Sequence, residues 1–252
     1  MAARHVWLGA GRSTGIGLAV AVVLSGGCAT GRFAALGPGT LTEGSPVLGV
    51  PVVQQEAERT CGGCALAMLS RYHGVAVRAE DMARVRQQAA GEKGVSGRIL
   101  KDVFERNGFD AYVFRGELSD AATPAGLAYH LQRGRPVMVM LSAGRGRNHY
   151  VVVTGLDETK DLVVIADPEK GNVVCRGDVF RHLWERSGFF ALLAVPAGDA
   201  LAARPLDDGE RASLDELSSR TPELADQSGG YLTNDDLVTI LLIILIVLLL
   251  PI

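Results

Sequence analysis

The chain has 252 residues, of which 48% are hydrophobic and 21% charged, and its formal net charge is −3 at pH 7. This composition allows one ordinary hydrophobic core with appendages, and the slightly acidic balance without a basic cluster excludes the charge pattern of a nucleic-acid-binding protein. The four cysteines (Cys28, Cys61, Cys64 and Cys175) are too few and too scattered for a disulfide scaffold.

Residues 1–28 have the pattern of an export signal. A weakly basic start precedes Ile16–Leu24, an apolar run of signal-peptide length. Small residues then lead to Cys28 in LSGGCAT, which resembles a bacterial lipoprotein cleavage site. We therefore predict a lipid-anchored N-terminus at Cys28, with an ordinary uncleaved membrane anchor as the alternative.

Residues 29–44 are glycine-rich without periodicity, which predicts a tether. Residues 45–198 predict one folded domain, in which helices come first and an antiparallel sheet follows, as in α+β folds. The predicted helices span 61–73, 79–89, 96–107, 124–133 and 179–186. The predicted strands span 48–53, 110–114, 136–141, 149–157, 161–167, 172–176 and 189–195.

The stretch QQEAERTCGGCALAMLSRYHG (54–74) places Cys61 where a loop becomes a helix, with Thr60 as the predicted N-cap. A thiol in the first helical turn lies near unpaired N–H groups at the positive end of the helix dipole, which favours the nucleophilic thiolate. Six residues upstream, Gln55 has a side-chain amide that can return toward the same thiol. Acyl transfer needs such a donor for its oxyanion, and Gln54 is the alternative donor.

A predicted hairpin supplies a base. In HYVVVTGLD (149–157) and DLVVIAD (161–167), a turn centred near Glu158 gives a register whose partner numbers sum to 316. His149 then lies directly opposite Asp167, and a carboxylate there can hold the imidazole in one tautomer. A slip of one residue would put the two side chains on opposite faces.

Taken together, the order of Gln55, Cys61-Gly62, Met68, Tyr72-x-Gly, His149 with its apolar strand and Asp167-Pro168 resembles the bacteriocin-processing (double-glycine leader) peptidases. These are papain-like cysteine peptidases (cysteine peptidase family thirty-nine), and the resemblance covers residues 45–198. It implies an α+β, papain-like fold with the nucleophile on an N-terminal helix and the histidine and aspartate on the sheet.

The resemblance also implies roles for the site residues. Cys61 is expected as the nucleophile, His149 as general base and acid, Asp167 as its orienting group, and Gln55 as part of the oxyanion hole. No cofactor or metal is expected. Family members often belong to peptide-exporting transporters with a nucleotide-binding domain. This sequence has no G-x-x-x-x-G-K-[ST] motif, so we expect a stand-alone member that binds no nucleotide or nucleic acid.

Four alternatives stay open from the residues alone. Cys61-Gly-Gly-Cys64 has the spacing of dithiol oxidoreductases, although their fold needs a βαβ pattern around the motif. A disulfide between these cysteines would switch a peptidase off. Zinc binding by Cys61, Cys64 and His149 lacks a second close ligand pair. A non-catalytic module of the same fold would bind peptides without cutting them. Cys175 is expected in the core.

Residues 199–236 are polar and acidic, which predicts a flexible linker. The uncharged stretch LVTILLIILIVLLLPI (237–252) predicts a C-terminal membrane tail, although 16 residues make a helix of only about 24 Å. Gly229-Gly230 lies between the two. Because it follows Glu223 and Leu224, it resembles a double-glycine cleavage site at which the enzyme would release its own tail.

The sequence therefore predicts an exported, membrane-attached cysteine endopeptidase. Its expected partners are a peptide or protein substrate, the membrane through both ends of the chain, and a peptide transporter.

Overall fold

The computed structural model describes residues 32–57, 59–91, 94–144, 147–198 and 203–229. Contacts divide the chain into two units, 1–30 and 31–252, and all described residues belong to the second. The predicted export signal with Cys28 and the predicted tail at 237–252 lie outside the described residues. Within the described ranges, no helix has the length and apolar character needed to cross a membrane.

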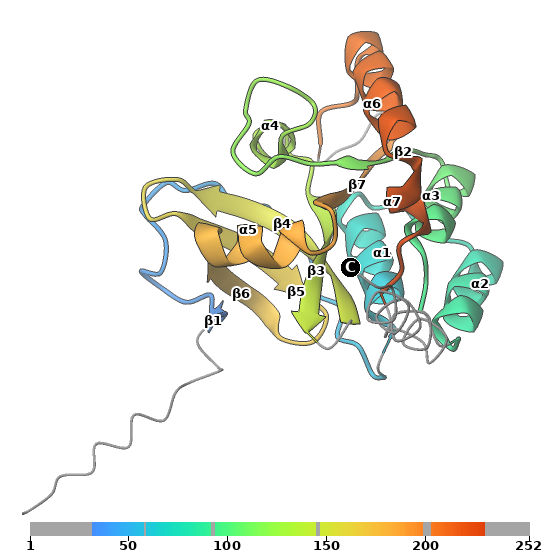
Figure 1. The fold of residues 1–252 in the computed structure, drawn as a ribbon, viewed down its shortest axis with the longest axis horizontal. Helices are drawn as coiled ribbons and strands as arrows, with labels where there is room; N and C mark the ends of the chain where they lie inside the picture. The colour runs from blue at the N-terminus through green and yellow to red at the C-terminus, as the bar shows by residue number, and fades with distance from the viewer. Residues whose placement is uncertain (1–31, 58, 92–93, 145–146, 199–202, 230–252) are drawn as a thin grey trace, which may run out of the picture. The chain divides into compact units, whose positions relative to one another are not determined.

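A seven-stranded sheet carries the described fold, with the strand order β1-β6-β5-β4-β3-β7-β2 (Figure 1). Every strand pairing in it is antiparallel, as the sequence predicted. The strands are β1 (Ala34–Ala35), β2 (Phe109–Arg115), β3 (Val137–Gly144), β4 (Arg147–Asp157), β5 (Leu162–Asp167), β6 (Gly171–Arg176) and β7 (Phe190–Pro196).

Helices cover both faces of this sheet. Along β3, Met138 and Met140 belong to one buried cluster, whereas Val137, Val139 and Leu141 belong to another. The first cluster includes side chains of α1 (Cys61–Tyr72), α2 (Ala79–Ala89), α3 (Gly97–Arg106) and α7 (Pro222–Asp226), which stand together in Figure 1. The second includes side chains of α4 (Leu127–Leu131), α5 (Gly177–Glu185) and α6 (Asp208–Arg220). Because both faces are buried, the central strands are apolar at nearly every position.

The predicted elements agree with the structure except at three places. The first is the helix predicted at 124–133, which is reduced to α4. The carboxylate of Asp120 accepts hydrogen bonds from the N–H groups of Ala122 and Thr123 and so holds a turn. Pro124 restricts the residue before it to extended backbone, so the helix begins only after Gly126.

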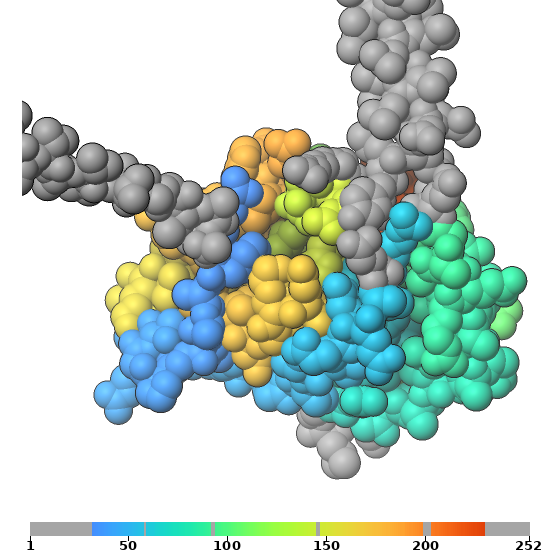
Figure 2. Space-filling model, turned by 90° about the horizontal axis from the view of Figure 1, so that it is seen from below, coloured from blue at the N-terminus to red at the C-terminus, as the bar shows by residue number. Residues whose placement is uncertain are grey.

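The second difference lies at 32–57, where residues 32–44 were predicted as tether and 48–53 as a strand. Ala34 and Ala35 instead pair with Val174 and Val173 of β6, and this segment runs beside β6 in Figure 2. Residues 48–53 form no strand; the segment attaches to the sheet through one bridge between Val47 and Gly155. Sequence periodicity missed these contacts because they are short and made by backbone.

The third difference is larger. The prediction of a flexible linker at 199–236 is wrong for residues 203–229, which include α6 and α7. Asp207 and Glu210 make a capping box that begins α6, and Leu206, Leu214 and Leu224 are buried. Glu210 also accepts two hydrogen bonds, both 2.9 Å, from the fully buried guanidinium of Arg135. The polar composition hid a segment held by a few apolar side chains and one buried ion pair.

Candidate active site

Cys61 is the first residue of α1 and is 3% exposed. Thr60 occupies the N-cap position, but its hydroxyl donates to the carbonyl of Ala57 at 2.7 Å and accepts no helix N–H. The first-turn N–H groups are therefore left without that side-chain acceptor. Gly62 lets α1 approach the sheet, because a Cβ there would lie 2.3 Å from Cγ1 of Val95 and 3.1 Å from the ring of Tyr150.

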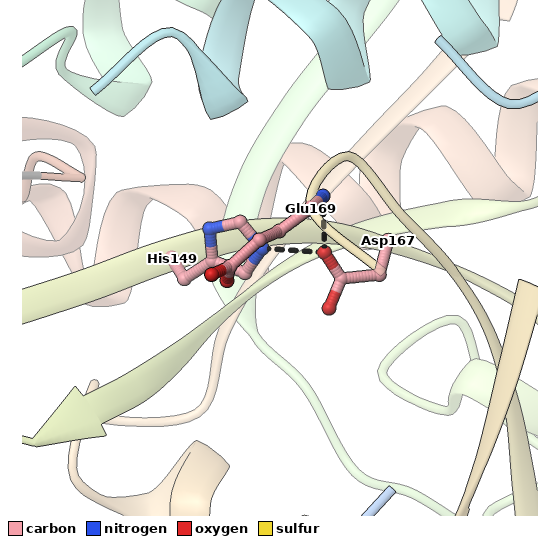
Figure 3. A group of neighbouring side chains, drawn as sticks. All are labelled: His149, Asp167 and Glu169. Atoms are coloured by element: carbon pink, nitrogen blue, oxygen red, sulfur yellow. Dashed lines mark hydrogen bonds and ion pairs between the residues drawn. The ribbon is translucent and has the colours of Figure 1, made fainter. Parts of the chain in front are cut away.

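His149 and Asp167 meet at the ends of β4 and β5. The Nε2 atom of His149 lies 2.8 Å from Oδ1 of Asp167, and the two side chains are 14% and 2% exposed (Figure 3). The thiol of Cys61 lies close enough to the imidazole to contribute to the raised pKa of His149. Because Nε2 is engaged by the carboxylate, Nδ1 is the ring nitrogen left for the thiol. The structure thus joins three of the four predicted site residues in one chain of contacts.

The register behind this pair differs from the predicted one, so the predicted sum of 316 is wrong. Asp157 pairs with Leu162, and beyond an irregularity at Thr154 the pairs are Val153–Ile165 and Val152–Ala166. Continued along the strands, this register places Asp167 opposite Val151, on the same side of the strand pair as His149. The two residues are diagonal neighbours, and long side chains reach across that distance.

The irregularity at Thr154 decides whether His149 and Asp167 lie on the same side of the strand pair. The register between the turn and Thr154 would place Asp167 opposite Val152, and His149 would then point to the other side. One extra residue in β4 restores the shared side. The N–H of Leu48 donates to the carbonyl of Thr154 at 2.8 Å, so the segment before Gln55 is attached at this same bulge.

The pKa values of the pair move apart. Burial lowers the pKa of His149, but its hydrogen bonds to Asp167 and Cys61 and their charges raise it more, to about 9. Burial raises the pKa of Asp167, and the contact with His149 lowers it further than that, to below its usual range. Backbone N–H groups of Glu169 and Lys170 donate to the same Oδ1, at 2.7 and 3.3 Å. The arrangement therefore holds an imidazolium next to a carboxylate near neutral pH.

Gln55 lies beside this pair. Its backbone N–H donates to the carbonyl of Pro168 at 2.9 Å, which fixes the loop before α1 against the turn after Asp167. Its Oε1 is buried and accepts no hydrogen bond among the described residues. Gln54, the alternative donor, is exposed, and its carbonyl oxygen lies 3.7 Å from Sγ of Cys64. The two glutamines therefore differ in that the side chain of Gln55 is partly buried beside the turn after Asp167, whereas that of Gln54 is exposed.

Cys61, Cys64 and Cys175 are free thiols. Burial raises the pKa of Cys64, and burial also raises that of Cys175, to about 12. A raised pKa disfavours the thiolate at both positions. Cys175 is buried in β6, as the sequence predicted.

Metal-ligating side chains gather at one place within the described ranges, where His149, Asp167 and Glu169 lie with their ligand atoms within 4.8 Å of one another (Figure 3). The zinc alternative of Cys61, Cys64 and His149 does not form such a group there. Nε2 of His149 and Oδ1 of Asp167 already bond each other, and Glu169 is exposed. In the present geometry, these three residues therefore belong to a hydrogen-bonded turn.

Sequence reasoning missed two neighbours of the site. Tyr150 packs beneath the first turn of α1, and the turn Asp167-Pro168-Glu169-Lys170 donates backbone N–H groups to the carboxylate. An aspartate followed by proline is a turn signal, and the sequence indicated a turn at Asp167-Pro168 but not that its N–H groups bind the carboxylate. The role of Tyr150 had no sequence signal because it depends on how α1 crosses β4.

Comparisons with known proteins identify the family of the chain and support its fold. The chain matches the model of the Peptidase C39 family over residues 49–195. A comparison with curated proteins returned no match. Among solved structures, a C39-like peptidase from Bacillus anthracis is similar with a TM-score of 0.50 and 19% identity, covering 62% of this chain and 99% of that one. This likeness shows the fold.

Two further solved structures are similar at lower TM-scores. One is a double glycine motif protease from an AMS/PCAT transporter in complex with its leader peptide (TM-score 0.47, 22% identity, 60% of this chain and 94% of that one). The other is the peptidase domain of Streptococcus ComA, a bifunctional ABC transporter involved in quorum sensing (TM-score 0.48, 19% identity, 58% and 98%).

Proposed function

Because the chain belongs to the peptidase C39 family, we propose that it is a cysteine endopeptidase that hydrolyses peptide bonds through Cys61. The family and the α+β, papain-like fold are those that the sequence predicted. One observation supports catalysis most directly, namely that the imidazole of His149 contacts both Asp167 and the thiol of Cys61. A buried imidazole between a carboxylate and a helix N-terminal thiol is an arrangement that activates a nucleophile.

In the proposed reaction, His149 already holds the proton of Cys61 as an imidazolium, and the thiolate attacks the carbonyl carbon of the substrate. The C–N bond breaks as the imidazolium protonates the departing amine, which leaves a thioester on Cys61. Water then attacks the thioester with His149 as base, and the free thiol returns. Asp167 stays ionised throughout; it keeps Nε2 of His149 occupied and stabilises the imidazolium.

Gln55 is proposed as an oxyanion donor, together with the backbone N–H of Cys61. The support is positional: the loop of Gln55 is fixed to Pro168, and its side chain lies partly buried next to the turn that carries Asp167. Donors that are held before reaction stabilise the developing charge without reorganisation.

The proposed substrate is a peptide cut after paired glycines. A similar solved structure is a double glycine motif protease in complex with its leader peptide, which supports this class of substrate. Export, lipidation at Cys28, membrane attachment and a transporter partner stay proposals that rest on the sequence. Incorporation of labelled fatty acid that disappears in Cys28→Ala would support the lipid anchor, and unchanged labelling would contradict it.

The two competing functions make different demands. A dithiol oxidoreductase needs both Cys61 and Cys64 on a βαβ fold, whereas every strand pair in the described part of the sheet is antiparallel. A binding module needs no thiol. We therefore take the purified full chain under reducing conditions, incubate it with a diverse peptide pool and identify cleavage sites by mass spectrometry. Cleavage should disappear in Cys61→Ala and persist in Cys64→Ala. A folded wild-type chain that cuts nothing would favour the binding module.

A further inference from the structure

The segment Gln227–Gly229 lies directly over the nucleophile. A Cβ added at Gly229 would lie 3.3 Å from Sγ of Cys61 and 2.8 Å from Cδ2 of Tyr150. Gly229 is buried, so this close approach leaves no room for a larger residue. The last described residues of the chain thus occupy the position where a substrate must lie for the thiol to reach it.

This segment pairs with residues 95–97 through backbone hydrogen bonds. The N–H of Gly97 donates to the carbonyl of Gln227 at 2.9 Å, and the N–H of Gly229 donates to the carbonyl of Val95 at 3.3 Å. Ser96 and Ser228 form an antiparallel bridge between the two segments. Extended peptides are commonly recognised through such backbone pairing, which is indifferent to sequence.

The other side of the segment is held by β4, next to His149. The amide of Asn148 donates to the carbonyl of Ser228 at 3.5 Å. The hydroxyl of Tyr150 lies 3.3 Å from the carbonyl oxygens of both Gln227 and Val95. The segment is therefore bound between two parts of the proposed catalytic domain.

The preceding helix anchors it. Leu224 of α7 is buried in the same cluster as Cys61, and Asp226 accepts two hydrogen bonds from the guanidinium of Arg98 on α3, at 2.7 and 2.9 Å. In Figure 1, α7 lies next to α3. An apolar anchor followed by a narrow glycine position is the arrangement of a docked peptide rather than of a linker.

From these contacts we infer that the C-terminal segment of this chain is a substrate of its own active site, docked in cis, and that cleavage within Gly229-Gly230-Tyr231 releases the apolar C-terminal stretch. This inference rests on the proposed peptidase function. Gly230 and Tyr231 lie outside the described residues. The thiolate forms a bond to the carbonyl carbon of Gly229 or Gly230, the following C–N bond breaks, His149 protonates the new amine, and water hydrolyses the thioester to a carboxylate.

The test follows the intact mass of the full chain in detergent under reducing conditions. Wild type should lose the fragment that begins at Gly230 or Tyr231, at a rate independent of protein concentration, and Cys61→Ala should retain it. Gly229→Val should slow the release at least about tenfold because its side chain would overlap the Tyr150 ring. Gly198→Val is the matched control, since a Cβ there meets nothing within 4 Å.

A second variant avoids the buried position. Asp226→Arg changes an exposed side chain, places two cations together and should also slow the release. Each chain is assayed in parallel on the peptide pool. A wild-type chain that cuts the pool but keeps its own tail overturns the inference and leaves the peptidase intact. Tail loss in Cys61→Ala, or loss whose rate rises with concentration, also overturns it. A chain that cuts neither removes both proposals.

Discussion

At the scale of single residues, the site depends on where protons are held. His149 has a pKa raised to about 9 through its contacts with Asp167 and Cys61, against the effect of its burial. The imidazolium is therefore present at neutral pH, next to a carboxylate whose own pKa is lowered. The influence of Cys61 on the pKa of His149 links the pair on the sheet to the first turn of α1.

This predicts a shift in the pH profile. Activity that needs the imidazolium should fall as pH rises through about 9. Asp167→Asn removes the charge that raises the pKa of His149, so burial prevails and the alkaline limit of kcat/KM should move to lower pH. The measurement is kcat/KM against pH on a cleaved peptide. The exposed Asp178→Asn is the control; an unmoved alkaline limit in Asp167→Asn would mean that another group sets it.

Two adjacent glutamines test the oxyanion proposal. Gln55→Ala should lower kcat roughly 10²–10³-fold, because one preorganised donor to the oxyanion is lost. Gln54→Ala should leave kcat within about threefold of wild type, since its side chain is exposed and only its backbone carbonyl contacts Cys64. Steady-state kinetics on the same peptide measures kcat for both variants. Equal losses in both variants would indicate a disturbed loop instead.

At the scale of elements, sequence periodicity located α1, α2, α3 and the strands β2 to β7 to within a few residues, since each has a strong apolar pattern. The pairing register was not accessible in the same way. The bulge at Thr154 is stabilised by Leu48, which is distant in sequence, and without it His149 and Asp167 would face opposite sides. The pair was thus predicted correctly through a register that was wrong by an even number of residues.

Helix α6 is attached through a buried ion pair that the composition concealed. Glu210→Gln leaves the charge of Arg135 buried and unpaired, and should lower the free energy of unfolding by about 3 kcal/mol. Glu216→Gln, in an exposed pair with Arg220, should change it by less than about 1 kcal/mol. Urea unfolding at pH 7 compares them. Equal small effects would show that α6 contributes little to the fold.

The same carboxylate has a predicted pH signature. Burial raises the pKa of Glu210, but hydrogen bonds from Arg135 and Tyr129 lower it overall to about 2. A carboxylate with a lowered folded-state pKa stabilises the fold above its ordinary pKa of 4.5 and loses that contribution as pH falls toward about 2. The stability difference between wild type and Glu210→Gln should therefore be full above pH 4.5 and shrink below it.

At the scale of the whole molecule, the folded region extends beyond the predicted boundary at residue 198. Leu206, Leu214 and Leu224 complete the buried clusters, and Arg135 requires Glu210. Residues 203–229, which were expected to belong to a linker before a membrane tail, are instead part of the domain. They also bring Gly229 next to Cys61, where an added Cβ would lie 3.3 Å from Sγ.

Two truncations test this boundary. A chain that ends at residue 198 should unfold at least about 10 °C below one that ends at residue 229, because apolar surface is exposed and a buried charge loses its partner. It should also bind a hydrophobic dye in its folded state. Thermal unfolding monitored by circular dichroism compares the two chains. Equal melting temperatures would instead support the prediction that this segment is a flexible linker.

The sequence by itself determined the family and the antiparallel α+β fold, and it proposed Gln55, Cys61, His149 and Asp167 as site residues, because helix starts, apolar runs and turn signals act over a few neighbours in the chain. Only the tertiary structure decided how these parts meet. The bulge that turns His149 toward Asp167, the ion pair that fixes α6, and the approach of Gly229 to Cys61 each join segments distant in sequence. Such contacts depend on how helices and strands pack against one another. The local sequence pattern of each segment does not encode that packing by itself.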